Sequence, residues 1–309
     1  MSLFAQMRIP LVVAPMFLVS SPELVIAAAR SGVIGGLPGP NARSLGTLSD
    51  WMERIHDALA PESLPWLFNM IVHPTYDRFD GEVELVKRYR PAIVSTALGS
   101  PTRVIDAIKS YGGSVYADVI TPEMARKSVA AGVDALILVT QGAGGHTGRY
   151  HPLAFIAEVR EFWDGPVGIA GCISRGDDVA AMLVAGADFV VAGTRFIGTD
   201  ESFASPGYKT MLTESSINDI VESKTITGVT ANWMKRSLEQ AGVPLDALGQ
   251  ETSVDFSGNA GSDDKAWKDV WSAGQGVGVV ERTEPCQAIV DQMVVEFHQA
   301  IKRTASLQS

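Results

Sequence analysis

Short apolar runs alternate with segments of helical apolar spacing from residue 10 to residue 194. A run of β-branched and apolar residues followed by an amphipathic helix is typical of a parallel α/β fold. Eight parallel strands are the number that can close into a barrel with a filled interior, so the pattern predicts a (β/α)8 TIM barrel. The eight predicted strands cover residues 10–15, 32–37, 66–72, 92–98, 114–120, 135–141, 166–171 and 188–194.

The intervening helices carry start and stop signals. The helix after the first strand has Ser20 or Ser21 as its cap, Pro22 in its first turn and Gly32 as its stop, which are the preferred residues at these positions. Residues 121–132 repeat this arrangement, and residues 152–163 and 174–186 predict two further helices.

The alternation stops after the eighth strand, and this predicts the domain organisation. We expect a barrel core over residues 1–207, an inserted cap or lid over 208–284, and a C-terminal helix within 285–309 that packs back on the barrel. The cap includes a polar stretch, residues 255–267, so a disordered loop with two packing helices is the alternative. Trp233, Trp267 and Trp271 favour an ordered segment, since they supply apolar surface to bury.

Composition and charge narrow the function classes. The chain of 309 residues is 46% hydrophobic with a net charge of -10, and no Lys/Arg-rich run favours nucleic acid or anionic lipid. We therefore expect a small-molecule substrate, no nucleic-acid or membrane partner and a cytoplasmic location, with a homo-oligomer left open. The two cysteines, Cys172 and Cys286, fit a reducing compartment. No His/Cys spacing typical of a metal site occurs.

The residues best suited to chemistry follow the predicted strands, where the active site of such a barrel lies. Strand six runs into QGAGGHTG, residues 141–148, which contains His146 among glycines that permit unusual backbone conformations. The sequences AGCI, residues 170–173, and AGTRF, residues 192–196, follow strands seven and eight. This pair is the usual phosphate site of a barrel.

The order of these motifs resembles the nitronate monooxygenase (2-nitropropane dioxygenase-like) family of FMN-dependent barrels. The resemblance rests on VAPM at 13–16, SPELVIAAARSGVIGGL, QGAGGHTG, the run from PVGIAGCISRG to GTRFIGTDES, and WSAGQGVG at 271–278. It implies that the FMN phosphate lies near Gly171, Cys172, Gly193 and Thr194. The flavin ring would lie near Ala14, Met16, Asn69 and Gln141, with Gly142 and Gly145 shaping the loop and Gln275 approaching from the cap.

The resemblance also implies a reaction, in which His146 acts as general base on a nitroalkane and electrons pass from the nitronate to O2. An imidazole titrates near working pH, as this role requires. The alternative is an NAD(P)H-dependent reductase of quinones, flavins or enoyl thioesters on the same barrel, and a third class is an FMN-binding protein with a regulatory role.

Several residues keep a structural alternative. His73 and Asp118 are candidate pocket residues, but His73 also fits an ordinary loop role and Asp118 a helix cap. His151 fits a helix-entry position. The alternative for His146 is a loop histidine bonded to a carbonyl. Asn69 and Gln141 also fit backbone bracing, and Met16 fits core packing.

Overall fold

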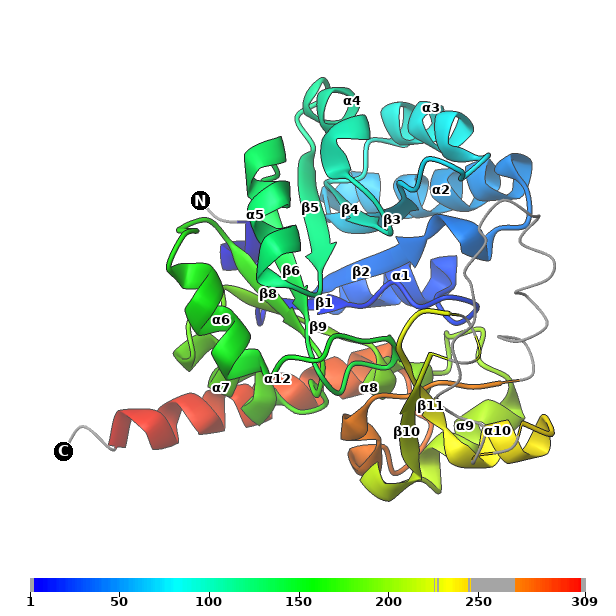
Figure 1. Cartoon of the computed structure of the whole chain (residues 1–309), viewed down its shortest axis with the longest axis vertical. Helices are drawn as coiled ribbons and strands as arrows, with labels where there is room; N and C mark the ends of the chain where they lie inside the picture. Colours follow the sequence, from blue (N-terminus) through cyan, green and yellow to red (C-terminus); the bar gives the residue numbers. More distant parts are fainter. Residues whose placement is uncertain (1–2, 225, 227, 244, 246–269, 307–309) are drawn as a thin grey trace.

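A closed barrel of eight parallel strands forms the body of the protein (Figure 1), as the sequence predicts. The computed structural model describes residues 3–224, 226, 228–243, 245 and 270–306. The strands close in the order β1-β2-β3-β4-β5-β6-β8-β9. Their bounds are β1 (Leu11–Val13), β2 (Ile34–Pro38), β3 (Trp66–Ile71), β4 (Ile93–Ala97), β5 (Ser114–Val119), β6 (Ala135–Val139), β8 (Val167–Ala170) and β9 (Phe189–Ala192).

Helices surround the barrel and connect its strands (Figure 1). They are α1 (Pro22–Arg30), α2 (Leu45–Leu59), α3 (Phe79–Tyr89), α4 (Ile105–Lys109), α5 (Pro122–Ala131), α6 (Pro152–Arg160), α7 (Gly176–Val184) and the short α8 (Thr194–Ile197). The structure confirms the predicted caps. The Ser21 hydroxyl accepts the N–H of Leu24 at 2.9 Å, and Thr121 caps α5 in the same way. Gly132 ends α5 at φ +92°, a left-handed conformation suited to glycine.

Aromatic side chains fill the amino-terminal half of the barrel. Phe189, the first residue of β9, is fully buried and stacks on Phe4 of the short 3-10 helix η1 (Leu3–Gln6) with ring centroids 4.4 Å apart. Gly168 leaves room for this ring, because a Cβ there would lie 2.2 Å from it. The amino-terminal end of the barrel is therefore packed, and the open space lies at the carboxyl ends of the strands.

A second, three-stranded sheet combines two strands from the chain after the barrel with one from the connection that follows β6. Its strands are β10 (Ile220–Ser223), β11 (Ala231–Met234) and β7 (Gly145–His146), and the accompanying helices are α9 (Pro206–Thr213) and α10 (Lys235–Gln240). Figure 1 shows β10, β11, α9 and α10 gathered at one side of the barrel. Trp233 is fully buried and Trp271 stacks on Tyr208, whereas Trp267 and the polar stretch 255–267 lie outside the described residues. The division at residues 208 and 285 stays a prediction.

The last helix, α12 (Cys286–Ala305), packs on α7 and α1 beside the seam between the first and last strands. The sequence predicts this helix from Pro285 to about Lys302, close to the observed bounds. Cys286 is buried at its start and Cys172 is exposed, and both thiols are free. No helix in the described part of the chain has the length and apolar character needed to cross a membrane.

Candidate active site at the carboxyl ends of the strands

A cavity of about 580 Å³ opens where the barrel strands end. This volume is in the range of small-molecule and cofactor sites. Every barrel strand contributes to the wall at or near its carboxyl end, through Ala14, Pro38, Asn69, Ala97, Asp118, Val139, Ala170 and Gly193. The alternation of strands and helices thus brings residues from the whole sequence to one opening.

Main-chain N–H groups form one side of this cavity, at the ends of β8 and β9. The N–H groups of Cys172, Ile173, Gly193 and Thr194 find no acceptor among the described residues. Gly171 turns the chain at φ +128°, and Cys172 adopts φ +57°, which is uncommon for a residue with a side chain. A Cβ on Gly193 would project toward Ala14 and Met16, so the absent side chain keeps the cavity open. Such unpaired N–H groups suit a phosphate.

Two glycine-rich motifs that are far apart in sequence pack backbone to backbone beside this cradle. Gln275, the first residue of the 3-10 helix η7 (Gln275–Val279), donates its N–H to the carbonyl of Gly142 at 3.0 Å. A Cβ on Gly274 would lie 2.5 Å from the same carbonyl oxygen, and one on Gly142 would lie 2.4 Å from the sulfur of Cys172. Gly274 also donates its N–H to the hydroxyl of Thr194 at 2.9 Å. Side chains at these glycines would separate the loops.

His146 lines the mouth of the cavity from β7, which pairs antiparallel with β11. Its side chain keeps an exposed surface, but the ring is surrounded by protein atoms that displace part of its hydration. This burial lowers the pKa of His146 below its ordinary value, because desolvation disfavours the charged imidazolium. A neutral imidazole at neutral pH can accept a proton.

The polar floor of the cavity is a hydrogen-bonded group on three adjacent strands. The Asn69 amide nitrogen donates to the Ser95 hydroxyl at 2.8 Å and to the Asp118 carboxylate at 3.1 Å. Removal from solvent raises the pKa of Asp118 to about 7, although the bond from Asn69 acts in the opposite direction. The same site therefore holds a carboxyl with a raised pKa and an imidazole with a lowered one.

The structure brings most of the predicted residues into this cavity wall. Those present are Ala14, Met16, Asn69, Asp118, Gly142, Gly145, His146, Gly171, Cys172, Gly193 and Thr194. Gln141, His73 and Gln275 are not part of the wall. Gln141 donates its N–H to the Tyr150 carbonyl, and the His73 ring accepts the N–H of Thr75, so these two brace their own loops. His151 accepts the N–H of Leu153 at the start of α6, which confirms its helix-entry position.

The family model for nitronate monooxygenases matches residues 41–296. This chain belongs to the nitronate monooxygenase family. The match covers the barrel from the loop after β2 onward, together with the added sheet and most of α12. It contains His146 and all the residues of the N–H cradle.

The names of proteins similar to this chain state several different activities. A Mycobacterium tuberculosis protein provisionally named a monooxygenase is 29% identical over 66% of this chain and 59% of its own length. An octahydroindene-carboxyl-CoA dehydrogenase of Rhodococcus jostii is 27% identical over 75% of this chain and 65% of its own length. A nitronate monooxygenase of Paraburkholderia phytofirmans is 28% identical over 75% of each chain. The chain thus spans less than two thirds of the first two relatives.

Solved structures share the fold over almost the whole chain. A nitroalkane oxidase from Streptomyces ansochromogenes superposes with a TM-score of 0.82 at 27% identity, covering 99% of both chains. FabK from Thermotoga maritima superposes with a TM-score of 0.80 at 24% identity, covering 99% of this chain and 97% of that one.

One wall of the cavity in this family member was missed from the sequence. The loop after β3 supplies Thr75, Tyr76, Asp77 and Arg78, whereas the sequence singled out His73 in that loop. Arg78 forms an ion pair at 3.2 Å with Glu82, which is fully buried and also accepts the Tyr76 hydroxyl at 2.7 Å. The position of this loop after a strand was the signal that it could line the cavity. Which of its side chains reach the cavity depends on how the loop packs against α3.

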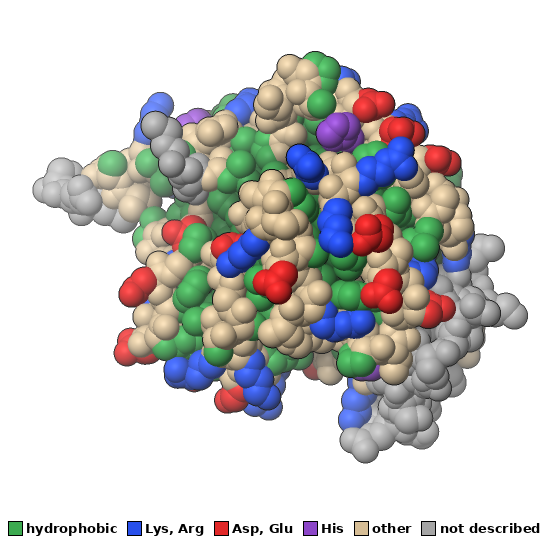
Figure 2. Space-filling model, turned by 90° about the horizontal axis from the view of Figure 1, so that it is seen from above, with side chains coloured by type: hydrophobic (Ala, Val, Ile, Leu, Met, Phe, Trp, Pro, Cys, Tyr) green, Lys and Arg blue, Asp and Glu red, His purple; other side chains and the backbone are tan. Residues whose placement is uncertain are grey.

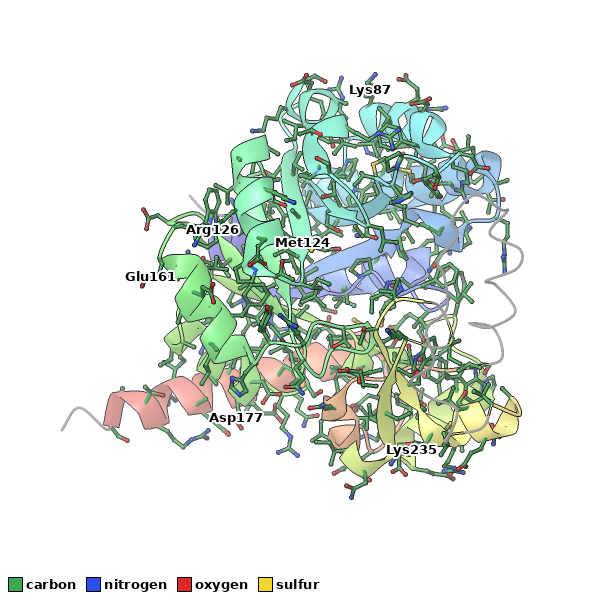
Figure 3. The ribbon with its side chains drawn as sticks, in the orientation of Figure 1. Lys87, Met124, Arg126, Glu161, Asp177 and Lys235 are labelled. Atoms are coloured by element: carbon green, nitrogen blue, oxygen red, sulfur yellow. The ribbon has the colours of Figure 1, made fainter. Side chains whose placement is uncertain are left out.

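The sequence predicts a cap over residues 208–284 but does not single out the cap residues that line the cavity. These residues are Tyr208, Val229, Ser272 and Gly276, and Ile120 and Met124 from the region where β5 leads into α5 also line the cavity. Met124 lies in the first turn of α5 (Figure 3). No strand-end signal marks these residues, because they come from outside the barrel strands.

The face drawn in Figure 2 carries interspersed acidic and basic side chains. The electrostatic field of that face therefore has no single sign, and it gives no indication of a charged macromolecular partner.

Proposed function

We propose that this protein is an FMN-dependent oxidoreductase that oxidises alkyl nitronates, and nitroalkanes after proton removal by His146, with O2 as electron acceptor. The observation that carries the proposal is one cavity with an N–H cradle on one side and the imidazole of His146 at its mouth. Of the described residues that line this cavity, His146 is the one histidine. Cytoplasmic action on a small molecule remains part of the proposal.

The residues present fit FMN. Proteins of this family typically bind this cofactor, and the open N–H groups around Gly171, Cys172, Gly193 and Thr194 would hold its phosphate. Ala14, Met16 and Asn69 would face the ring, while Gly142 and Gly145 let the loop approach it; Gln141 and Gln275 would support this loop from behind. When bound, FMN supplies the electron transfer from substrate to O2.

His146 would carry out the proton transfer. A neutral nitroalkane has an acidic C–H bond next to the nitro group, and breaking it leaves the electron pair on the nitronate while the proton goes to a ring nitrogen of His146. The lowered pKa of His146 keeps the imidazole neutral and ready to accept. The imidazolium formed then lies beside the nitronate anion and stabilises it electrostatically.

A second candidate is an NAD(P)H-dependent reductase of a quinone, flavin or enoyl thioester. Arg43 and Arg78 line the cavity on the side of β2 and β3, and β3 lies four strands from β8 in the closed order. Guanidinium groups bind phosphates well, although that of Arg78 already donates to the carbonyls of Ala42 and Gly39 and pairs with Glu82. A phosphate-bearing nicotinamide or thioester substrate would fit this arrangement.

Anaerobic mixing distinguishes the two candidates. The purified protein loaded with FMN is mixed with a nitronate, and separately with NADH or NADPH, while flavin absorbance is followed. We expect rapid bleaching or a spectral change with the nitronate. Bleaching by a nicotinamide alone would instead establish the reductase, and failure to retain FMN under any loading condition would refute the cofactor assignment.

The substitution His146→Ala tests the base. We expect kcat/KM for a neutral nitroalkane to fall by about 100-fold or more, in line with the usual contribution of a general base, with a much smaller effect on preformed nitronate. The matched control is His151→Ala, which removes a histidine that caps α6 and lies outside the cavity wall. Unchanged turnover of the nitroalkane by His146→Ala would show that the base is another group.

A further inference from the structure

The loop that carries His146 is joined to the segment after the barrel through the second sheet. Ala231 of β11 pairs with His146, and Asn232 pairs with Gly145, in antiparallel register. The N–H of Thr147 donates to the carbonyl of Thr230 at 3.0 Å. The backbone on both sides of the histidine is therefore fixed by a strand more than 80 residues later in the chain.

The side chain of Asn232 adds a second connection. It is 2% exposed, and its amide nitrogen donates to the carbonyl of Ala143 at 2.7 Å and to the hydroxyl of Thr147 at 3.4 Å. An amide NH2 has two hydrogens, so one group can serve both acceptors. These acceptors lie on either side of His146, and Asn232 therefore spans the segment that presents the imidazole.

The loop is rich in glycine, and within it the Ala143 N–H and the Thr147 hydroxyl donate to the Thr140 carbonyl. Gly142 and Gly145 have φ values of +90° and +65°, and Gly144 lies between them. Glycine loses more conformational freedom on ordering than any other residue, so a defined position for His146 requires contacts from outside the loop. The described residues supply them from β11 and from the segment around Gly274.

We propose that Asn232 is a positioning residue for proton removal by His146, holding the loop so that the imidazole meets the substrate carbon. This inference rests on the proposed function. It assigns to the segment after the barrel a part in the chemical step that acts through His146, beyond covering the cavity. A displacement of about 1 Å at a reacting group can reduce a rate about 100-fold, so loss of the two side-chain bonds is expected to act mainly on the proton transfer.

The test uses Asn232→Ala and Asn232→Asp in the FMN-loaded full chain. The first removes both donors, and the second keeps the size but places a carboxylate against the Ala143 carbonyl. We expect kcat for a neutral nitroalkane to fall about 10- to 100-fold, with less than about threefold change on preformed nitronate. The isotope effect with the α-deuterated nitroalkane should rise, because proton removal becomes more fully rate-limiting.

The matched control is Asn218→Ala, which changes an exposed asparagine in the segment after the barrel. Within the described residues, the Asn218 side chain forms no hydrogen bond with the His146 loop. This variant should retain wild-type rates and isotope effect.

Two outcomes would overturn the inference. The first is that both Asn232 variants keep the wild-type isotope effect, and the second is that they lose activity equally on nitroalkane and nitronate. If His146→Ala is fully active, the proposed function fails as well. If His146→Ala is impaired and both Asn232 variants are normal, only the positioning role fails.

Discussion

At the residue scale, two ionisable side chains in the cavity have pKa values moved in opposite directions by burial. The pKa of Asp118 is raised to about 7, whereas that of His146 is lowered from its ordinary value. Both shifts favour the neutral form, since desolvation penalises charge of either sign. At neutral pH the cavity therefore presents a neutral base and a carboxyl that is partly protonated. This combination suits a substrate that is neutral when it enters and anionic after it loses a proton.

Asp118 should make the binding of anions depend on pH. Its carboxyl gains negative charge as pH rises through about 7, and an anion about 8 Å away would then be repelled by roughly 2 kcal/mol at an effective dielectric constant near 20. We expect the affinity of the FMN-loaded protein for nitrate, a planar anion like the nitronate group, to fall at least about tenfold between about pH 6 and about pH 8. Calorimetric titration measures this affinity.

Asp118→Asn should remove this decline, because the amide stays neutral. His146 also loses positive charge as pH rises, but its lowered pKa moves this change toward more acidic pH, so the part of the decline that Asp118→Asn removes belongs to Asp118. Asp77→Asn is the control, since it changes an exposed carboxylate that lines the same cavity. An equally steep decline in Asp118→Asn would assign the effect to another group.

At the element scale, the ends of the helices are set by local residues. Ser21 and Thr121 accept N–H groups in the first turns of α1 and α5, and both helices have proline in that turn. Gly132 closes α5 in a left-handed conformation with nothing within 4 Å of the place where a Cβ would be. The requirement for glycine there comes from the backbone conformation and not from crowding.

Gly132→Ala should therefore destabilise the protein by about 1–2 kcal/mol, the cost of a left-handed conformation for a residue with a Cβ. Gly46→Ala is the contrasting variant, since Gly46 lies in α2 with an ordinary φ, and a Cβ there would meet only the Ser44 hydroxyl within 4 Å. It should stabilise the protein by up to about 1 kcal/mol. Urea denaturation followed by circular dichroism measures both, and equal shifts of the midpoint would contradict this account.

At the scale of the whole molecule, α12 joins the two ends of the barrel. Its buried residues Ile289 and Met293 belong to one apolar cluster with Leu11 of β1 and Val190 of β9, and these two strands pair directly. An exposed ion pair joins α12 to α7, where Arg303 contacts Asp177 at 2.5 Å; Asp177 is labelled in Figure 3. The final helix thus stabilises the seam at which the barrel closes.

Gly176 makes the close packing of α7 on α12 possible. A Cβ there would lie 2.0 Å from the Met293 carbonyl oxygen and 2.3 Å from the Phe297 nitrogen, both backbone atoms. We expect Gly176→Ala to destabilise the protein by about 1–3 kcal/mol and to increase hydrogen exchange in α12. Val184→Ala, at an exposed position in the same helix, should stay within about 0.5 kcal/mol of wild type. Normal protection of α12 in Gly176→Ala would contradict this role.

The barrel was predictable because its signals are local. Strand runs, caps and stopping glycines are read from neighbouring residues, and all eight predicted strands overlap those observed. Much of the candidate site was also predictable, because a parallel barrel gathers its strand ends at one opening. The place of His146 and Gly193 after strands assigned them to that opening, and the family resemblance assigned Asn69 to it, although their chemical roles stay predictions.

The sequence by itself determined the number and order of the barrel strands, the ends of α1 and α5, and the glycines that follow β8 and β9. Each follows from backbone conformation and periodicity over a few residues. Only the tertiary structure decided that Asn232 holds the His146 loop, that Arg78 pairs with buried Glu82, and that His73 and Gln141 stay out of the cavity wall. These outcomes depend on contacts between distant segments, where packing and burial select one partner among many residues of similar local character.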